Sequence, residues 1–367
     1  MAGLMKPIRR VVTGNDAQGR SKVLWDGPAP KVNESSLPGR GHTDMWVWAS
    51  TPAPLAGESD DGNMPYVFPA PPDGGHFRVI QAMPRPAGYD PARDPEAVAP
   101  HDVKMRPAGR AWDRGGNNAF TSAMHKTESI DYGIVLEGER VMILDDREIM
   151  LNQGDIVIQV GAWHQWRHPN LRCLMAFDMI PAEFVDGPLG LAQGSDAVMR
   201  ADPTQPLPPG VKPARRVVTI DREPGKSSLV SDGPSPDMRF DPARPGFASA
   251  RLWVTDSHPA KIVYETLHLP HTLEPPPRGS VCRVLTIPPD DAWRGKIGAA
   301  AVQAFFQAMG SPQASTYSPR APHPYMQRTR SLDCCCILSG EVVLVLDTQE
   351  VSLKVGDVVI QRGTNHA

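Results

Sequence analysis

Three residues in the first half of the chain have the types and spacing of a metal site. His125 and Asp131 lie six positions apart, and His164 follows in a later apolar run. Six residues of extended chain span about 20 Å, so the chain must turn between Thr127 and Asp131 if these side chains are to converge. Two imidazoles and one carboxylate with open positions form the ligand set of non-haem Fe(II) sites, and Mn, Ni or Zn use similar ligands. The sequence therefore predicts a divalent metal site with Fe(II) favoured.

The same pattern recurs 202 positions later with one ligand changed. Residues 326–367 read MQRTRSLDCCCILSGEVVLVLDTQEVSLKVGDVVIQRGTNHA and repeat residues 124–166 without a change of register. The second set is Gln327, Asp333 and His366, in which an amide replaces the first histidine. A neutral amide is a poor ligand beside an imidazole, so we expect the second set to bind metal weakly or not at all.

Further side chains near the first set are candidates for contact with a small-molecule substrate. They are polar or aromatic residues of the repeated core: Thr127, Tyr132, Gln159, Trp163 and Trp166. For the two tryptophans, shaping an apolar pocket and plain core packing are both open. The three predicted ligands also have a structural alternative, a hydrogen-bonded polar cluster that fills the core without metal. No catalytic acid, base or nucleophile is identified.

Short apolar runs separated by Gly, Asp and Asn surround these residues. The runs of the first half are 132–136, 140–144, 148–151, 156–160, 164–167 and 174–180. Evenly spaced strands with such turns predict an antiparallel sandwich or barrel. One helix is expected at 297–309, where apolar residues recur every four positions before Gly310, and we expect it to pack against the side of a barrel.

The repeats divide the chain into two domains. The predicted fold is all-β, with two antiparallel jelly-roll barrels in tandem, long Pro-rich arms and one helix in the second half. The first domain spans 1–200 with its core at 120–182, and the second spans 201–367 with its core at 320–367 and its last strand apparently missing. The arms repeat as well: residues 9–30 match those 206 positions later. Other repeated arm segments are expected to extend the sheet of their own barrel or to cross to the other half.

The bulk composition excludes several classes of partner. The formal net charge is −3, so no basic field favours nucleic acid or an anionic membrane. No apolar run approaches the length of a membrane span, and the N-terminal MAGLMKPIRR lacks the apolar core of a secretory signal. Five cysteines, three of them consecutive, are not a disulfide framework. We expect a cytoplasmic protein whose partner is a small molecule.

The pattern of ligands and glycines resembles the two motifs of the cupin family. The positions that carry the resemblance are, in order, His125, Thr127, Asp131, Gly138, Gly154, Gly161 and His164. With both copies counted, the chain resembles a bicupin of the small-cupin subgroup found in bacteria and in fungal natural-product pathways. It departs from the family at Thr127, where cupins usually have a second histidine, and at Asp131, where they usually have glutamate.

The resemblance implies an intramolecular pseudo-dimer of barrels, with a homodimer also possible, and an activity among dioxygenases, decarboxylases and isomerases. The leading hypothesis is a metal-dependent enzyme of the non-haem Fe(II) oxygenase type, acting on a small organic molecule in the N-terminal barrel, with secondary metabolism as its setting. One alternative is a metal-dependent lyase, decarboxylase or isomerase. The other is a non-catalytic bicupin that binds a small molecule. The substrate, metal and reaction stay open.

Overall fold

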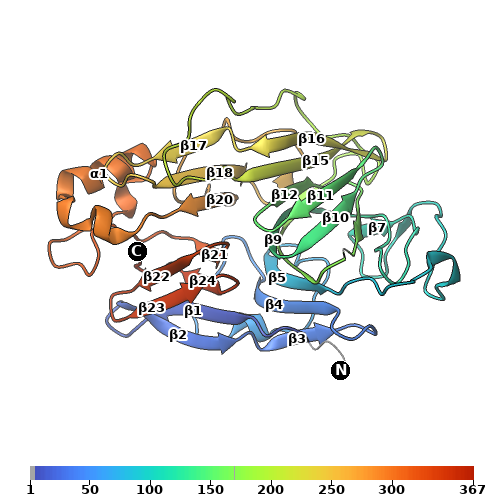
Figure 1. Cartoon of the computed structure of the whole chain (residues 1–367), viewed down its shortest axis with the longest axis horizontal. Coiled ribbons are helices and arrows are strands. Elements are labelled where there is room, and N and C mark those ends of the chain that lie inside the picture. Colours follow the sequence, from blue (N-terminus) through green and yellow to red (C-terminus); the bar gives the residue numbers. More distant parts are fainter. Residues whose placement is uncertain (1–4, 169) are drawn as a thin grey trace.

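The computed structural model describes residues 5–168 and 170–367, and these residues are mostly β-structure, which confirms the all-β prediction (Figure 1). The first four residues of the N-terminal segment lie outside this description. The strands of the first half are β1 (Arg9–Asn15), β2 (Ser21–Pro28), β3 (Lys31–Glu34), β4 (Gly41–Trp48), β5 (Gly75–Ala82), β6 (Lys104–Met105), β7 (Ala111–Asp113), β8 (His125–Thr127), β9 (Ser129–Glu137), β10 (Glu139–Ile143), β11 (Glu148–Asn152), β12 (Ile156–Val160), β13 (Gln165–Arg167) and β14 (Cys173–Glu183).

The second half repeats this plan. Its strands are β15 (Arg215–Glu223), β16 (Lys226–Pro234), β17 (Asp237–Phe240), β18 (Ala248–Thr255), β19 (Ala260–Lys261), β20 (Ser280–Thr286), β21 (Leu332–Cys336), β22 (Glu341–Val345), β23 (Glu350–Lys354) and β24 (Val358–Arg362). The helices are α1 (Ala299–Ala308) and short 3-10 turns at Asp61–Asn63, Pro91–Arg93, Asp290–Ala292, Arg294–Lys296 and Pro312–Ala314. Within the described residues, no helix is long and apolar enough to cross a membrane.

The first half is a sandwich of sheets around an apolar core. The larger sheet has the order β16-β15-β12-β9-β14-β5-β4-β3, the smaller has the order β11-β10-β13, and a third, β6-β7-β8, carries His125. The core contains Val135, Met142, Leu151, Val157, Trp166, Met175, Phe177 and Met179. Among the described residues, no strand pairing closes a sheet into a barrel. The sheets pack face to face in a jelly-roll-like sandwich, which fits the predicted antiparallel sandwich or barrel.

The two halves exchange their first strands. β15 of the second half pairs in parallel with β12 of the first, from Ile156↔Arg216 to Gln159↔Thr219. β1 of the first half likewise pairs in parallel with β24 of the second. Figure 1 shows this exchange, with blue β1 beside red β24 and yellow β15 beside green β12. The other repeated arm strands, β4 and β5, stay in the sheet of their own half.

Equivalent ion pairs fasten the two exchanged strands. Arg9 of β1 contacts Asp357 of the second half at 2.8 Å, and Arg215 of β15 contacts Asp155 of the first half at 2.5 Å. Pairs at the surface contribute little free energy, about 1 kcal/mol or less each. Their value here is geometric, because each guanidinium fixes the register of an arm on the other half.

The faces of the large sheets that point away from the sandwich cores pack the halves together. Alternate residues of a strand face opposite sides, so Ile130 and Tyr132 of β9 join this interface while Asp131 and Val135 face the sandwich interior. The partners from the second half include Leu252, Trp253 and Cys282. The chain's division near residue 200 therefore separates the sequence repeats but not the sheets.

Helix α1 was predicted correctly, including its role. Val302, Phe305 and Phe306 are buried against Trp293 and other aromatic residues of the second half. Gly310 has a positive φ of 65° directly after the helix, where a side chain would be strained. The helix therefore packs on the second half, and its apolar side is covered.

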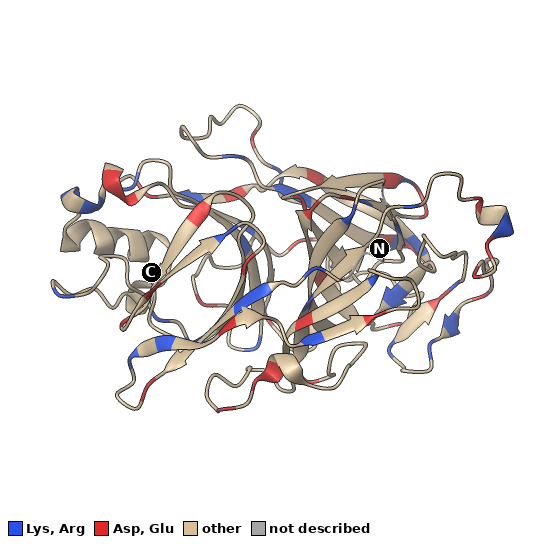
Figure 2. Ribbon diagram, turned by 60° about the horizontal axis from the view of Figure 1, so that its bottom comes forward, with Lys and Arg blue, Asp and Glu red and all other residues tan. Residues whose placement is uncertain are grey.

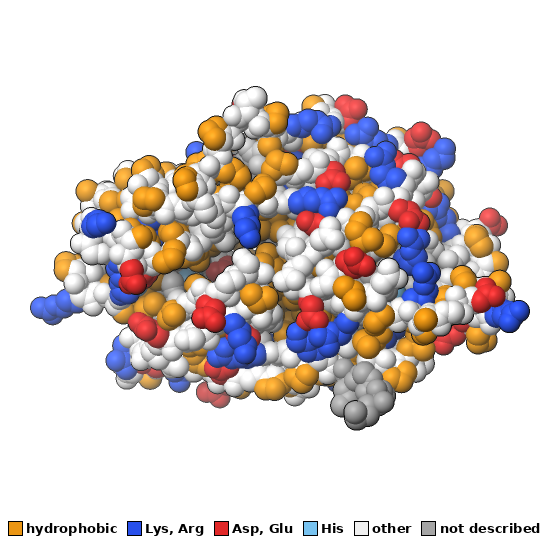
Figure 3. All heavy atoms as spheres, in the orientation of Figure 1, with side chains coloured by type: hydrophobic (Ala, Val, Ile, Leu, Met, Phe, Trp, Pro, Cys, Tyr) orange, Lys and Arg blue, Asp and Glu red, His pale blue; other side chains and the backbone are white. Residues whose placement is uncertain are grey.

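Charged residues of both signs are spread over the ribbon and over the face visible in Figure 3. Lys and Arg alternate with Asp and Glu along strand ends and loops (Figure 2). No single-sign field covers this face, as the net charge of −3 predicted.

Separating the repeats should expose apolar surface in each. A fragment of residues 1–200 loses β15 and β16, which leaves the edge of β12 unpaired and the interface face of β9 uncovered. We expect this fragment to be insoluble or to self-associate, and co-expression with residues 201–367 to restore a soluble complex. Size-exclusion chromatography with light scattering measures both. A soluble, folded, monomeric first half would contradict the exchange.

Candidate functional site

His125 and His164 meet on neighbouring strands, as the sequence predicted. Their backbones form an antiparallel bridge, with both N–H···O distances at 2.9 Å. Their rings lie 4.2 Å apart between centroids. Gly161, with a positive φ of 56°, turns the chain between β12 and this bridge, and its backbone conformation strains any other residue. The turn thus returns His164 to the strand that carries His125.

Backbone carbonyls fix the orientation of both rings. The Nδ1 atom of His125 lies 2.7 Å from the carbonyl oxygen of Ala123, and that of His164 lies 2.9 Å from the carbonyl oxygen of Ala162. A neutral ring that donates from Nδ1 carries its lone pair on Nε2. Burial lowers the pKa of His164 to about 4 and lowers that of His125 well below its usual value. Both imidazoles are therefore neutral at physiological pH, the form that binds metals.

Asp131 lies on the same interior face as part of a buried polar row that crosses the large sheet. Its cross-strand neighbours are Gln159 on β12 and Met179 on β14, and the row continues to Thr219 on β15 and His76 on β5. Four residues of the row have buried polar atoms without a partner among the described residues: Asp131 Oδ1, Gln159 Oε1, Thr219 Oγ1 and both ring nitrogens of His76. Burial raises the pKa of Asp131 to about 7.

Asp131 does not complete a three-ligand set with the two histidines. Within residues 5–168 and 170–367, no group of three His, Cys, Asp or Glu side chains is close enough to hold one metal ion. The structure thus brings the two imidazoles together and leaves Asp131 outside such a group, while metal binding by these residues stays a prediction. The reason is local: β8 and β9 belong to different sheets, so the turn between them places Asp131 in the sheet floor and His125 in the adjoining sheet.

His76 is the functional candidate that the sequence interpretation missed. It is fully buried. It lies directly opposite Met179 of β14 in the strand register, on the sheet face that includes Asp131. Burial lowers its pKa well below the usual value, and the charge of Arg78 adds to this. The available signal was the alternation of His76, Arg78 and Ile80, which places a histidine on the interior side of an arm strand.

The predicted substrate contacts divide into two groups. Gln159 and Trp166 face the interior: Gln159 Nε2 lies 3.6 Å from the sulfur of Met142, and Trp166 packs edge-on against His164 at 5.6 Å between centroids. Thr127 is buried in β8, two residues from His125.

The other two contacts point elsewhere. Trp163 is fully buried under the guanidinium of Arg114, which lies 4.3 Å from its ring centroid. Tyr132 faces the interface between the halves, where its hydroxyl lies 2.7 Å from Ser280 Oγ. Tyr132 is next to Asp131 in a strand, so its side chain lies on the opposite face of the sheet from Asp131.

A residue from the exchanged strand holds both histidine-bearing segments. Asp221 of β15 forms a buried ion pair with Lys126 at 2.6 Å and accepts a hydrogen bond from the backbone N–H of Trp163 at 3.1 Å. Lys126 follows His125 and Trp163 precedes His164. Burial raises the pKa of Asp221 and lowers that of Lys126, and each charge opposes the shift of the other. The second half thus positions the site of the first.

The second half repeats the site geometry with different chemistry. Gln327 and His366 form the equivalent backbone bridge, and Gln327 Nε2 lies 3.2 Å from His366 Nε2. The Gln327 amide is therefore a hydrogen-bond partner of His366 Nε2, whereas the equivalent Nε2 of His164 has no hydrogen bond to a described residue. Asp333 accepts a hydrogen bond from Ser331 Oγ at 2.7 Å. The carboxylate and the imidazole of this set both have partners within the protein.

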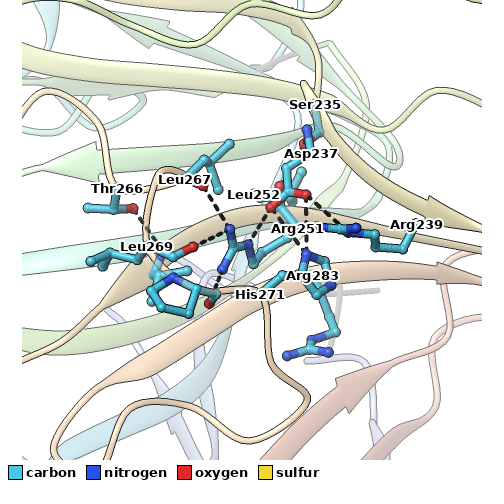
Figure 4. A network of polar contacts seen from close by, with 12 residues as sticks. Ser235, Asp237, Arg239, Arg251, Leu252, Thr266, Leu267, Leu269, His271 and Arg283 are labelled. Atoms are coloured by element: carbon cyan, nitrogen blue, oxygen red, sulfur yellow. Dashed lines mark hydrogen bonds and ion pairs between the residues drawn. The ribbon is translucent and has the colours of Figure 1, made fainter. Parts of the chain in front are cut away.

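The second half has two arginines at the positions where the first half has a buried Asp–Arg ion pair. Asp44 and Arg78 pair across β4 and β5 at 2.8 Å, whereas the equivalent cross-strand positions hold Arg251 and Arg283. Arg251 is neutralised by Asp237 at 2.6 Å and bonded to the carbonyl oxygens of the following loop: Leu267, Leu269 and Pro270 (Figure 4). This network ties the loop after β19 to β18.

A cavity of about 540 Å³ lies outside the two sandwich interiors. It is lined by residues of the connecting segment between Gln193 and Met199, by Val254 at the end of β18, by Lys261 of β19 and by residues that follow, such as Tyr264. None of the predicted site residues lines it. This cavity is therefore not the substrate pocket expected beside His125 and His164.

Comparison with known proteins links the chain to cupins over short stretches. No family model matches the chain. Phomopsin biosynthesis cluster proteins C' and D of Diaporthe leptostromiformis are each 52% identical over 67 residues, 18% of this chain and 30% of the relative. A cupin-domain-containing oxidoreductase, virC, of Hypocrea virens is 48% identical over 48 residues, 13% of this chain and 25% of the relative. The chain thus spans less than a third of the length of these relatives.

Among solved structures, a putative ethanolamine utilization protein of Salmonella typhimurium is 12% identical, with 48% of this chain and 99% of that chain covered and a TM-score of 0.24. This score is too low to support an argument. The similarity to the cupin-domain-containing oxidoreductase supports the cupin resemblance over this short stretch.

Removing Asp221 should destabilise the site. The variant Asp221→Ala leaves the ammonium of Lys126 buried without a counter-charge, which costs about 3–5 kcal/mol. The double variant with Lys126→Met should recover most of this loss. Urea denaturation measures the free energy of unfolding, with Glu223→Ala, an exposed residue of the same strand, as the control. If Asp221→Ala and Glu223→Ala lowered the free energy of unfolding equally, the buried pair would not be what holds the two histidine-bearing segments.

Asp131 should make stability fall as pH rises. Its folded pKa of about 7 lies above the unfolded value near 3.8, so the folded state holds the proton more tightly. The associated stability is complete below pH 4 and is lost as pH rises through about 7. In metal-free protein, Asp131→Asn should therefore gain stability over the wild type at pH 8, by about 4 kcal/mol, and show little gain at pH 4. Unfolding curves at both pH values test this, and a gain that is equal at both would contradict the raised pKa.

Proposed function

We propose that this chain is a cupin-type enzyme of secondary metabolism that acts on a small organic molecule beside His125 and His164. The observation that carries the proposal is the pair of buried, neutral imidazoles whose Nδ1 atoms are held by carbonyls. Their Nε2 atoms have no hydrogen bond to any residue that the structure describes. The similarity to a cupin-domain oxidoreductase and to fungal biosynthesis cluster proteins supports the class and the setting.

The histidine pair fits a divalent cation in part. Two bare Nε2 atoms would supply two ligands, and the buried Oδ1 of Asp131, which lacks a partner among the described residues, is a third donor on the same interior face. Asp131 would have to move toward the pair to bind the same ion. Fe(II) is favoured for two imidazoles and a carboxylate, with Mn, Ni or Zn as alternatives. When bound, the ion would supply Lewis acidity or a site for oxygen beside the substrate.

The surrounding side chains would orient the substrate. Trp166 presents an aromatic edge next to His164. Gln159 Oε1 accepts hydrogen bonds from polar groups of a ligand, since no described residue occupies it. Asp131 has a pKa of about 7 without a cation, and binding a cation would hold its carboxylate deprotonated, as a ligand requires. A metal-dependent lyase, decarboxylase or isomerase would use the same groups.

We further propose that the chain is a bicupin whose second half is architectural. Its site is closed by the Gln327–His366 contact, and its β1–β24 pairing supports the first half through the exchange. The halves then form an intramolecular pseudo-dimer. Whether two chains also form a homodimer is a separate proposal that light scattering on the whole chain tests.

A second candidate is a non-catalytic protein that binds a small metabolite. The observation in its favour is that no three-ligand set is assembled in the residues that the structure describes. Under this alternative, ligand affinity depends on the polar row and survives the loss of His164.

Metal content should depend on the first histidine pair alone. Anaerobically purified wild type should contain about one first-row metal per chain, and His164→Ala should lose it because one imidazole cannot hold the ion. His366→Ala, the equivalent change in the second half, is the matched control and should keep the metal. Elemental mass spectrometry measures both. The non-catalytic alternative would be favoured if the wild type contained no metal and the His164→Ala variant still bound the ligand.

The reciprocal change extends this test. Gln327→His rebuilds an imidazole pair with His366 on the same backbone bridge, so a second equivalent of metal should bind, more weakly than the first. If Gln327→His binds no additional metal while the first site is loaded, an imidazole pair alone is insufficient, and the carboxylate contribution at the first site gains weight.

A further inference from the structure

One arginine inside the first sandwich has no acidic partner among the residues that the structure describes. Arg140 of β10 is only 7% exposed, and its Nε and Nη1 atoms are buried without a hydrogen-bond partner among those residues. Alternation along β10 puts its side chain on the same face as Met142, which belongs to the apolar core. Burial lowers the pKa of Arg140 to about 10, so the guanidinium keeps its charge at neutral pH. A buried charge is costly unless a partner neutralises it.

The groups around Arg140 are themselves basic. The pairing of β10 with β13 puts His168 at the same end of the sandwich as Arg140. Burial lowers the pKa of His168 to about 3, and the charges of Arg140 and Arg40 lower it further. Arg40 donates a hydrogen bond to the carbonyl oxygen of Ala119 at 2.7 Å, and the charge of Glu96 opposes the lowering of its pKa by burial. No described carboxylate acts on Arg140 in this way.

Trp166 connects this cation with the histidine pair. Its ring centroid lies 5.7 Å from the guanidinium carbon of Arg140 and 5.6 Å from the ring centroid of His164. Met142 lies opposite Trp166 in the strand register, so Arg140 lies toward one end of the tryptophan and His164 toward the other. The interior of the first sandwich therefore has a cation at one side of Trp166 and the imidazoles at the other.

The second half has no cation at the equivalent position. The repeat offset of 202 pairs Arg140 with Val342, which packs against the apolar core of the second half. The sandwich therefore forms with an apolar residue at this position. The arginine accompanies the bare histidine pair and is missing beside Gln327 and His366, the pair that is closed by its own hydrogen bond.

We propose that Arg140 binds the carboxylate of the substrate, whose apolar body lies along Trp166 with its reacting end at the histidine pair. This inference rests on the proposed function, because it names the substrate class of the same site. A guanidinium matches the planar geometry of a carboxylate, and a bound carboxylate neutralises the buried charge. The aromatic ring between the two ends suits an apolar or aromatic body. A phosphate suits the position less well, since Arg40 already donates to a backbone carbonyl and Arg140 alone would serve its oxygens.

The test measures the binding of benzoate to the whole chain after a chelator has removed any metal. Isothermal titration calorimetry should show saturable binding of benzoate. Benzamide, which has the same ring without the charge, should bind about tenfold more weakly. Inorganic phosphate should bind no better than benzamide, because it has no apolar body to lie along Trp166.

Variants of the chain locate the binding. Arg140→Met should weaken benzoate binding about tenfold, while the midpoint of thermal unfolding should rise because no unpaired charge is then buried. Arg140→Lys keeps the charge without the planar fork and should retain part of the affinity. Arg167→Met is the matched control, because Arg167 follows Trp166 on the outer face of β13 and pairs with Glu148 at the surface. Its benzoate affinity should equal that of the wild type.

The outcomes that contradict the proposal are separate from those that contradict the enzyme. Equal binding of benzoate and benzamide, equal affinity of Arg140→Met and Arg167→Met, tighter binding of phosphate than of benzoate, or no benzoate binding would overturn the carboxylate site. A chain that contains no metal as purified but binds benzoate through Arg140 supports the carboxylate site and counts against the proposed enzyme. A chain that contains metal but does not bind benzoate has the reverse meaning.

Discussion

The buried pair of Asp221 and Lys126 is the interaction on which the candidate site depends. It joins a strand that the second half contributes to the segment that carries one histidine, and the same carboxylate holds the turn before the other histidine. An ion pair removed from water is stable only with good geometry and additional hydrogen bonds. Here the 2.6 Å contact and the Trp163 N–H meet that requirement. The exchange of strands is therefore part of the site as well as of the fold.

The second half shows what happens where this interaction is absent. At the positions equivalent to Asp221, Lys126 and Trp163 stand Asn15, Arg328 and Asn365. Arg328 instead donates to the carbonyl oxygen of Gly363, and the amide of Asn365 contacts Asp347. The backbone bridge at the histidine has the same geometry in both halves. The side chains that hold the bridge differ between the halves, and so does the residue at the position of the first predicted ligand, His125 or Gln327. This joint difference separates a site that presents bare nitrogens from one that is closed by its own glutamine.

The sequence was sufficient to predict where most strands of the first half's core lie, but it was insufficient to predict which side chains of different sheets come close together. Alternation and turn residues located β9 to β14, and the constant repeat offset predicted that His164 and His366 occupy equivalent bridges. The sequence did not place Asp131 relative to His125, because the short connection at Glu128 can lead to the same sheet or to the next, and local spacing does not distinguish the two. Crossing of β1 and β15 also depends on tertiary pairing that no local pattern encodes. His76 was missed because it lies in an arm, far in sequence from the motif.

The polar row of the first half contains several buried atoms without a partner among the described residues. A buried donor or acceptor without a partner costs about 1–3 kcal/mol, and a domain's whole stability is only about 5–15 kcal/mol. Asp131, Gln159 and His76 each carry such atoms on one interior face. In the second half, the equivalent carboxylate is bonded to Ser331 and the equivalent of His76 is Val281, which needs no partner. The two copies therefore differ at the carboxylate and at the position of His76, whereas Gln361 Oε1, the counterpart of Gln159 Oε1, is likewise buried without a partner among the described residues.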